Sequence, residues 1–165
     1  MVVLILRLIR FFSLLIPIWL CTDARAEGIE SNRLLILGDS LSAGYNLDKG
    51  KSWVDYVAQS NELSSMNLTV FNASFSGETS SGGLSRLPGL LQRHQPNFVL
   101  IILGGNDGLR GLPLKKLSNN LDNIFKIVRE AKAIPLYAGV DLPPNFGKPF
   151  TEAFRKVQNN AAKRN

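Results

Sequence analysis

The sequence predicts an α/β fold in three layers, with helices on both faces of a parallel β-sheet. Two observations support this prediction. Short, nearly continuous apolar runs end abruptly in small polar loops, which is typical of strands buried on both faces. Stretches with apolar residues at helical spacing separate these runs, as the crossovers between parallel strands require.

The first half of the domain supplies two strands and two helices. Residues 33–37 are the first expected strand, which ends at Gly38. A helix is expected over residues 53–59, capped by Ser52 with Asp55 at its third position and with Trp53, Tyr56 and Val57 on its apolar face. Residues 68–71 are β-branched and aromatic enough for a second strand, and a loop is expected over 72–83.

The second half continues the alternation. Leucines at helical spacing over residues 84–91 indicate a helix, in which Pro88 should produce a kink or begin a second short helix. Residues 98–103 are the most strongly apolar strand candidate and break into a glycine-rich loop at Gly104. A one-sided apolar pattern over residues 114–128 predicts a helix, 134–138 a fourth strand, and about 151–163 a last helix.

Residues 1–26 have the pattern of a cleavable signal peptide. Arg7 and Arg10 precede the apolar run 11–21, and small residues lead to Ala26, where we expect cleavage. The run is well short of the roughly 20 residues that a transmembrane helix needs, so no stable membrane span is expected after cleavage. We therefore predict export, to the periplasm of a bacterium, and one domain over residues 27–165.

Composition excludes several functional classes. The chain of 165 residues has 45% hydrophobic and 19% charged residues, which fits a globular protein. Its net charge of +6 is scattered and forms no basic stripe, so nucleic-acid binding is not expected. The one cysteine lies in the signal segment and the one histidine is His94, so we expect no disulfide, no metal site and no cofactor. The oligomeric state stays open.

Three of the four expected strands end in unusual small-polar loops, where sites form in parallel sheets. Ser40 follows the first strand on a tight turn, which suits an exposed nucleophile but equally a capping serine. Gly77 lets its N–H approach a substrate closely, and Asn106 offers a neutral amide donor for an oxyanion, although each is also an ordinary turn residue.

Together, Gly38-Asp-Ser-Leu-Ser-Ala-Gly-Tyr45, Ser76-Gly-Glu-Thr-Ser80 and Gly104-Gly-Asn-Asp-Gly108 resemble the GDSL or SGNH hydrolase superfamily. The similarity is greatest to its exported thioesterases, arylesterases and lysophospholipases. It implies a flavodoxin-like sheet and hydrolysis of small-molecule acyl esters or thioesters. It also implies that Ser40 is the nucleophile and that the Ser40 N–H, the Gly77 N–H and the Asn106 side chain form an oxyanion hole.

Apolar loop residues offer a place for the acyl group. Leu109 and the loop that begins Leu142-Pro143 are candidates to line a substrate groove, although apolar loop residues also pack simply against a domain. The sequence does not distinguish thioester, aryl ester and lysophospholipid as the preferred substrate.

The catalytic base of the family has no counterpart in these 165 residues. The family places it in a late Asp-x-x-His block, whose His deprotonates the serine. We expect the fold to lack its last strand and helix, and hydrolysis to be impaired or absent, in a truncated or frame-shifted product or in a relative that has lost catalysis. The alternative function is that of a non-catalytic acyl-binding relative.

The other titratable residues are poor substitutes for that base. His94 is expected at the end of the sheet opposite the three loops, in a structural or exposed position. Asp107 and Asp141 lie nearer the site, but an ordinary carboxylate is a weak base for an alcohol. Asp107 is expected to shape the Asn106 loop instead.

Overall fold

Four parallel strands form the sheet, in the order β2-β1-β3-β4. In the computed structural model, which describes residues 32–165, these strands are β1 (Asn32–Gly38), β2 (Leu68–Asn72), β3 (Phe98–Ile102) and β4 (Ile134–Tyr137). All pairings are parallel, with Leu34 opposite Val70 and Phe98, and Phe98 opposite Ile134. The flavodoxin-like α/β fold is thus confirmed. The predicted signal peptide lies outside the described residues.

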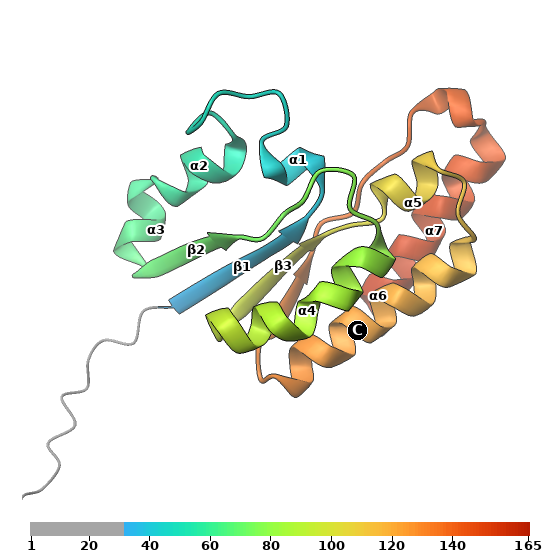
Figure 1. The fold of residues 1–165 in the computed structure, drawn as a ribbon. Coiled ribbons are helices and arrows are strands. Elements are labelled where there is room, and N and C mark those ends of the chain that lie inside the picture. Colours follow the sequence, from blue (N-terminus) through green and yellow to red (C-terminus); the bar gives the residue numbers. More distant parts are fainter. Residues whose placement is uncertain (1–31) are drawn as a thin grey trace, which may run out of the picture. The chain divides into compact units, whose positions relative to one another are not determined.

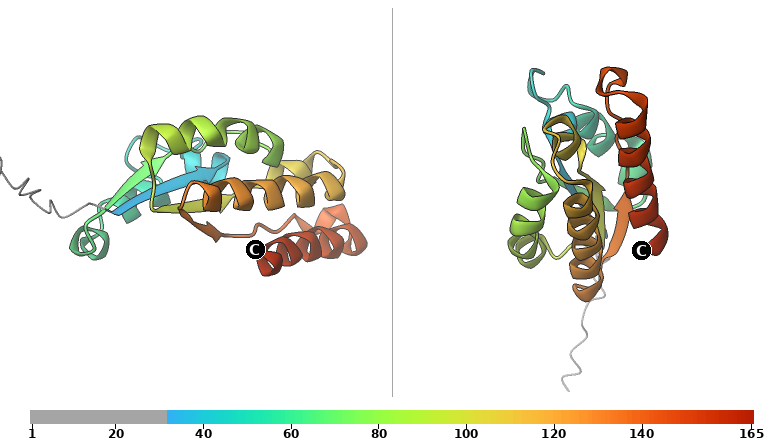
Figure 2. Two further views of the ribbon diagram at one scale, coloured as in Figure 1. Left: turned by 90° about the horizontal axis from the view of Figure 1, so that it is seen from below. Right: turned by 90° about the vertical axis from the view of Figure 1, so that its right-hand side faces the viewer.

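One face of the sheet carries the main core. Two long helices, α4 (Ser80–His94) and α6 (Leu114–Glu130), lie side by side on this face (Figure 1). Their buried residues, such as Leu87 and Leu121, pack against Leu35 and Ile101 of the strands. The last helix, α7 (Lys148–Arg164), runs along α6 and adds Phe154 to the same core (Figure 2).

The opposite face is covered by a smaller group of residues. Val54 of α2 (Trp53–Ala58) packs there against Ile36 and Ile102, and α3 (Asn61–Ser65) follows α2. This cover does not reach β4, where Ile134 and Leu136 remain 54% and 44% exposed. The register places both on the same side of the sheet as Ile36.

The helix after residue 52 corrects one prediction. The capping box forms as predicted, with Ser52 Oγ accepting from the Asp55 N–H and the Asp55 carboxylate accepting from the Ser52 N–H. The predicted apolar face of Trp53, Tyr56 and Val57 is wrong, because these side chains are exposed and Val54 is the residue of α2 that is buried. Because the helix contributes one residue to the core, it needs no repeat of apolar residues at helical spacing, and such a repeat does not mark its buried side.

Helix α4 differs from the prediction in two ways. It begins at Ser80, where the Thr79 hydroxyl accepts from the Gly82 N–H, so the loop expected over 72–83 ends earlier. It also runs through Pro88 without a break, and no second helix begins there. Pro88 itself lies on the exposed side of the helix.

The remaining elements lie at the carboxyl end of the strands. These are α1 (Ser40–Ala43), α5 (Gly105–Leu109) and the 3-10 turn η1 (Pro144–Phe146) before α7. In Figure 1 the arrowhead of β1 points to the end of the sheet where α1 lies. Within residues 32–165, no helix combines the length and the hydrophobicity that crossing a bilayer requires.

Candidate active site

Ser40 is held on a tight turn between β1 and α1. Asp39 caps the helix, since its Oδ1 accepts from the Leu41 N–H at 3.0 Å. Gly38 is required just before it, because a Cβ there would lie 2.9 Å from Ser74 Oγ and 3.0 Å from Ser42 Oγ. Strand, glycine and cap together place Ser40 at the first position of α1, where its N–H has no carbonyl partner within the helix.

Asn106 is presented by α5 at the end of β3. The turn into α5 depends on Gly104, whose φ of 115° lies in the left-handed region. The Asn106 Nδ2 donates to the Glu78 carbonyl at 2.9 Å and, over a longer 3.3 Å, to Asp39 Oδ2. The carboxamide therefore bridges the loops that follow β1 and β2.

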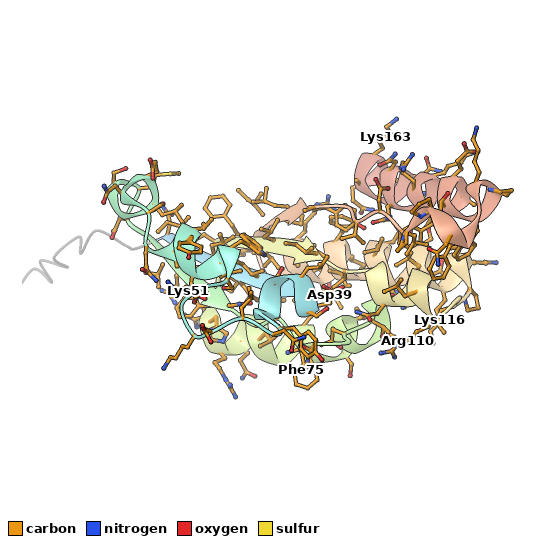
Figure 3. The ribbon with its side chains drawn as sticks, turned by 90° about the horizontal axis from the view of Figure 1, so that it is seen from above. Asp39, Lys51, Phe75, Arg110, Lys116 and Lys163 are labelled. Carbon is orange, nitrogen blue, oxygen red and sulfur yellow. The ribbon has the colours of Figure 1, made fainter. Side chains whose placement is uncertain are left out.

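Gly77 lies in the loop between β2 and α4. Its φ of 78° is again left-handed, which favours glycine. The Gly77 carbonyl accepts from Arg110 Nη2 at 2.9 Å, and the Phe75 N–H of the same loop donates to the Gly38 carbonyl at 3.0 Å. Figure 3 shows Phe75 and Arg110 on the same side of the molecule as Asp39. Hydrogen bonds thus tie the loops after β1, β2 and β3 to one another.

A cavity of about 220 Å³ opens between α1, α5 and the loop before α7. Ser40, Asn106, Leu109, Leu142 and Pro143 line this cavity, so the structure brings together five of the six residues that the sequence suggested. Gly77 is not among its lining residues; it lies beside Glu78, to which Asn106 bonds.

Sequence reasoning missed four residues that line this cavity, namely Asp39, Leu41, Gly105 and Val140. Asp141, which the sequence placed near the site, lines the cavity as well. Leu41 follows Ser40 directly, and its apolar character beside a candidate nucleophile was a usable signal. Arg110 was not a candidate, and its bond to the Gly77 carbonyl is visible only in the structure.

The titratable groups near the cavity already have partners. Asp141 forms an exposed ion pair with Arg155 at 2.9 Å, and its hydrogen bond raises the pKa of that guanidinium. Asp107 is buried and accepts from the Ser80 N–H and hydroxyl, so it is a structural part of the Asn106 loop.

His94, the one histidine of the sequence, lies far from this end of the sheet. It ends α4 and packs on Phe71 with 4.7 Å between ring centroids, while its carbonyl accepts from Arg33 near the start of β1. In the part of the chain that the structure describes, no three His, Cys, Asp or Glu side chains lie close enough to hold a metal ion.

Comparison with known proteins identifies the relatives of this arrangement. The family described as GDSL-like Lipase/Acylhydrolase matches residues 36–165. The chain is 39% identical over 150 residues to an arylesterase of Vibrio mimicus, covering 91% of this chain and 73% of that protein. It is 45% identical over 133 residues to thioesterase 1/protease 1/lysophospholipase L1 of Escherichia coli K12, covering 81% of this chain and 62% of that protein.

Solved structures show the same fold. The crystal structure of TesA matches with a TM-score of 0.76 at 42% identity, covering 81% of this chain and 74% of that one. The psychrotrophic esterase EstA from Pseudoalteromonas, inhibited by monoethylphosphonate, matches with a TM-score of 0.77 at 39% identity, covering 81% and 73% respectively. The chain thus spans between about three fifths and three quarters of the length of these relatives.

Proposed function

Because the chain belongs to the GDSL-like lipase/acylhydrolase family, we propose that it acts on acyl esters or thioesters through an acyl-enzyme formed on Ser40. One observation carries this proposal: Ser40 and Asn106 line the same cavity as Leu109, Leu142 and Pro143. A nucleophile, an amide donor and apolar side chains around one space are three of the features that hydrolysis of an acyl group requires, besides a base.

In the proposed reaction, Ser40 Oγ adds to the acyl carbonyl, the ester or thioester bond breaks, and the alcohol or thiol leaves with the proton that Ser40 gives up. Water then releases the acid from the acyl-enzyme. The negative charge that forms on the carbonyl oxygen would be met by the N–H groups of Ser40 and Gly77 and by Asn106 Nδ2. The Asn106 amide would exchange its longer bond, the 3.3 Å contact with Asp39, for this oxygen, while the 2.9 Å bond to Glu78 keeps the side chain oriented.

The proton of Ser40 has no strong acceptor among the described side chains. His94 lies at the other end of the sheet, and the Asp107 carboxylate is occupied by Ser80. We therefore propose that these 165 residues turn over esters slowly or not at all. The chain would then keep the cavity as an acyl-binding site, which is the second candidate function.

The cavity favours a short or partly exposed acyl group. Its volume of about 220 Å³ lies below the usual range of small-molecule sites, roughly 300–1,000 Å³. Two of the leucines that line the cavity are largely exposed, Leu109 at 49% and Leu41 at 60%. A longer chain would therefore extend across these leucines.

We also propose that the protein is exported by the segment ending near Ala26.

A fluorophosphonate probe tests the role of Ser40, because phosphorylation of a serine needs an activated hydroxyl. Because Ser40 has no strong proton acceptor, we expect slow labelling of the wild type on the peptide that contains Ser40, and none in Ser40→Ala. Ser81→Ala, which changes an exposed serine of α4, is the matched control and should label like the wild type. Equal labelling of Ser40→Ala would remove Ser40 from the nucleophile role.

A binding titration separates the two candidate functions. If the wild type does not label, saturable binding of a long-chain fatty acid without ester hydrolysis would support the acyl-binding function. Leu142→Asp, which places a charge in the cavity wall, should then weaken that binding. Absence of both labelling and binding would contradict both functions.

A further inference from the structure

A buried carboxylate lies directly behind the candidate oxyanion hole. Asp107 of α5 is 2% exposed and follows Asn106 in the chain, yet it is not among the residues that line the cavity. Its Oδ2 accepts from the Ser80 N–H at 2.7 Å and its Oδ1 accepts from Ser80 Oγ at 2.5 Å. A buried charge is costly unless its oxygens are satisfied, and here Ser80 satisfies both.

The partner of this carboxylate joins a third helix. Ser80 is the first residue of α4, and its hydroxyl oxygen accepts from Asn120 Nδ2 of α6 at 2.8 Å. Ser80 is fully buried and Asn120 nearly so. Asp107, Ser80 and Asn120 thus form a polar network that ties α5 to the two helices of the main core.

The network fixes the two segments that carry the candidate donors. Asn106 Nδ2 donates to the Glu78 carbonyl, and the Ser80 N–H donates to Asp107. Residues 78–80, which directly follow Gly77, are therefore joined to residues 106 and 107 by three hydrogen bonds, two of them from Ser80. The three bonds use neighbouring side chains of α5, so they resist rotation of that helix as well as its displacement.

Helix α5 needs such an anchor. It has five residues, from Gly105 to Leu109, and its N-cap Gly104 makes no side-chain capping bond. So short a helix is marginal alone, because nucleation is unfavourable and few internal hydrogen bonds follow. The position of Asn106 is consequently set by tertiary contacts.

We infer that Asp107 is a positioning residue, which through Ser80 holds the Asn106 carboxamide and the Gly77 segment in the geometry that meets the oxyanion. What the carboxamide does there rests on the proposed function; that Asp107 fixes its place does not. Asp107 acts on the substrate only through Asn106, so its loss should slow the reaction of Ser40 without abolishing the fold.

The test compares Asp107→Asn and Ser80→Ala with two controls. Asp122→Asn changes a partly exposed carboxylate of α6 that pairs with Arg164, and Ile124→Val weakens the buried core away from the site. Two readouts are needed on each folded variant: the rate of fluorophosphonate labelling and the ¹⁵N–¹H resonances of the Asn106 side-chain amide, assigned with Asn106→Asp. The second readout needs no catalysis.

We expect Asp107→Asn to label about 10-fold to 100-fold more slowly, since misplacing a catalytic group by about 1 Å costs up to about 100-fold. Ser80→Ala, which keeps the backbone bond to Asp107, should lose less. Both should shift the Asn106 amide resonances, whereas Asp122→Asn and Ile124→Val should change neither readout.

Each outcome decides between the two ideas. Shifted Asn106 resonances in a protein that never labels would support the positioning role and count against the hydrolase. Normal labelling and unshifted resonances in Asp107→Asn would overturn the positioning role and leave the hydrolase standing. A slower rate matched by Ile124→Val, with Asn106 unshifted, would reduce Asp107 to general stability and also overturn the inference. If Asp107→Asn does not fold, Ser80→Ala decides by the same two readouts.

Discussion

Gly108 is the position where a single methyl group should do most harm close to the site. It lies in α5 beneath Leu142 and Phe154, and an added Cβ would stand 2.6 Å and 2.7 Å from the two Leu142 methyl carbons and 2.9 Å from Phe154 Cε2. Both side chains are buried in the main core, so neither is free to turn away. Gly108→Ala therefore forces the core and the cavity wall to move.

The magnitude follows from two opposing effects. Overpacking a core costs about 1–3 kcal/mol, while replacing a helical glycine by alanine gains up to about 1 kcal/mol. We expect Gly108→Ala to lower the free energy of unfolding by about 1–2 kcal/mol. Gly89 of α4 is the matched control, because it is exposed and a Cβ there meets nothing within 4 Å. Gly89→Ala should raise the free energy of unfolding by about 0.5–1 kcal/mol.

Urea unfolding followed by circular dichroism measures this difference. The two variants should differ by about 1.5–3 kcal/mol, which at a slope of about 1–3 kcal/mol per molar urea separates their midpoints by roughly 1 M. The wild type should unfold between them. A Gly108→Ala midpoint equal to or above that of Gly89→Ala would show that Leu142 yields to the methyl group, and the packing argument would be wrong.

Three further predictions concern charges and protons. The Ser52 hydroxyl, and then its N–H, hold the pKa of Asp55 below its ordinary value, so this stabilisation is complete above about pH 4 and is lost as pH falls through the folded-state pKa. Ser52→Ala should flatten the acid side of a plot of urea midpoint against pH, and an unchanged acid side would contradict this. Burial, and then the negative charge of Asp107, raise the pKa of Tyr137 well above its ordinary value. Its stabilisation is therefore intact up to about pH 10 and is lost as pH rises further, which Tyr137→Phe should abolish in the same assay. Arg86→Ala leaves the buried Glu78 carboxylate without its 2.7 Å partner and should lower the free energy of unfolding by about 1–3 kcal/mol. The same substitution should cost less in a protein that already carries Glu78→Gln. Strictly additive losses in this double-mutant cycle would argue against the pair.

The strands could be predicted from the sequence because burial on both faces leaves a plain pattern. Residues 33–37 and 98–103 consist of Leu, Ile and Val except for Arg33 and Phe98 at their starts, and each run forms a strand within one residue of the expected limits. The helix after Ser52 was found by its capping box, which is local chemistry. The buried side of this helix could not be predicted, because it is set by the contact of Val54 with the sheet and not by a repeat of apolar residues at helical spacing.

The site could be predicted in part. Ser40, Asn106, Leu109, Leu142 and Pro143 line one cavity, as the positions of their loops at the carboxyl edge of a parallel sheet suggested. The bonds that organise the site were beyond sequence reasoning, because they join residues distant in the chain, such as Asp107 to Ser80. Of the two effects expected of Pro88, the start of a second helix is wrong, because α4 continues through this residue.

The outer strand β4 has a practical consequence for anyone purifying this protein. Ile134 and Leu136 form an exposed apolar patch on this face of the sheet, and such patches on two molecules associate at high concentration. The N–H groups of even-numbered residues of β4 point towards β3: Ile134 donates to the Asn97 carbonyl and Ala138 donates to the Ile101 carbonyl. Residue 135 therefore faces away from β3, and because it is a proline, it offers no N–H to another strand. We therefore expect aggregation through contacts between these apolar patches rather than through strand pairing at the sheet edge, and Leu136→Lys should suppress it.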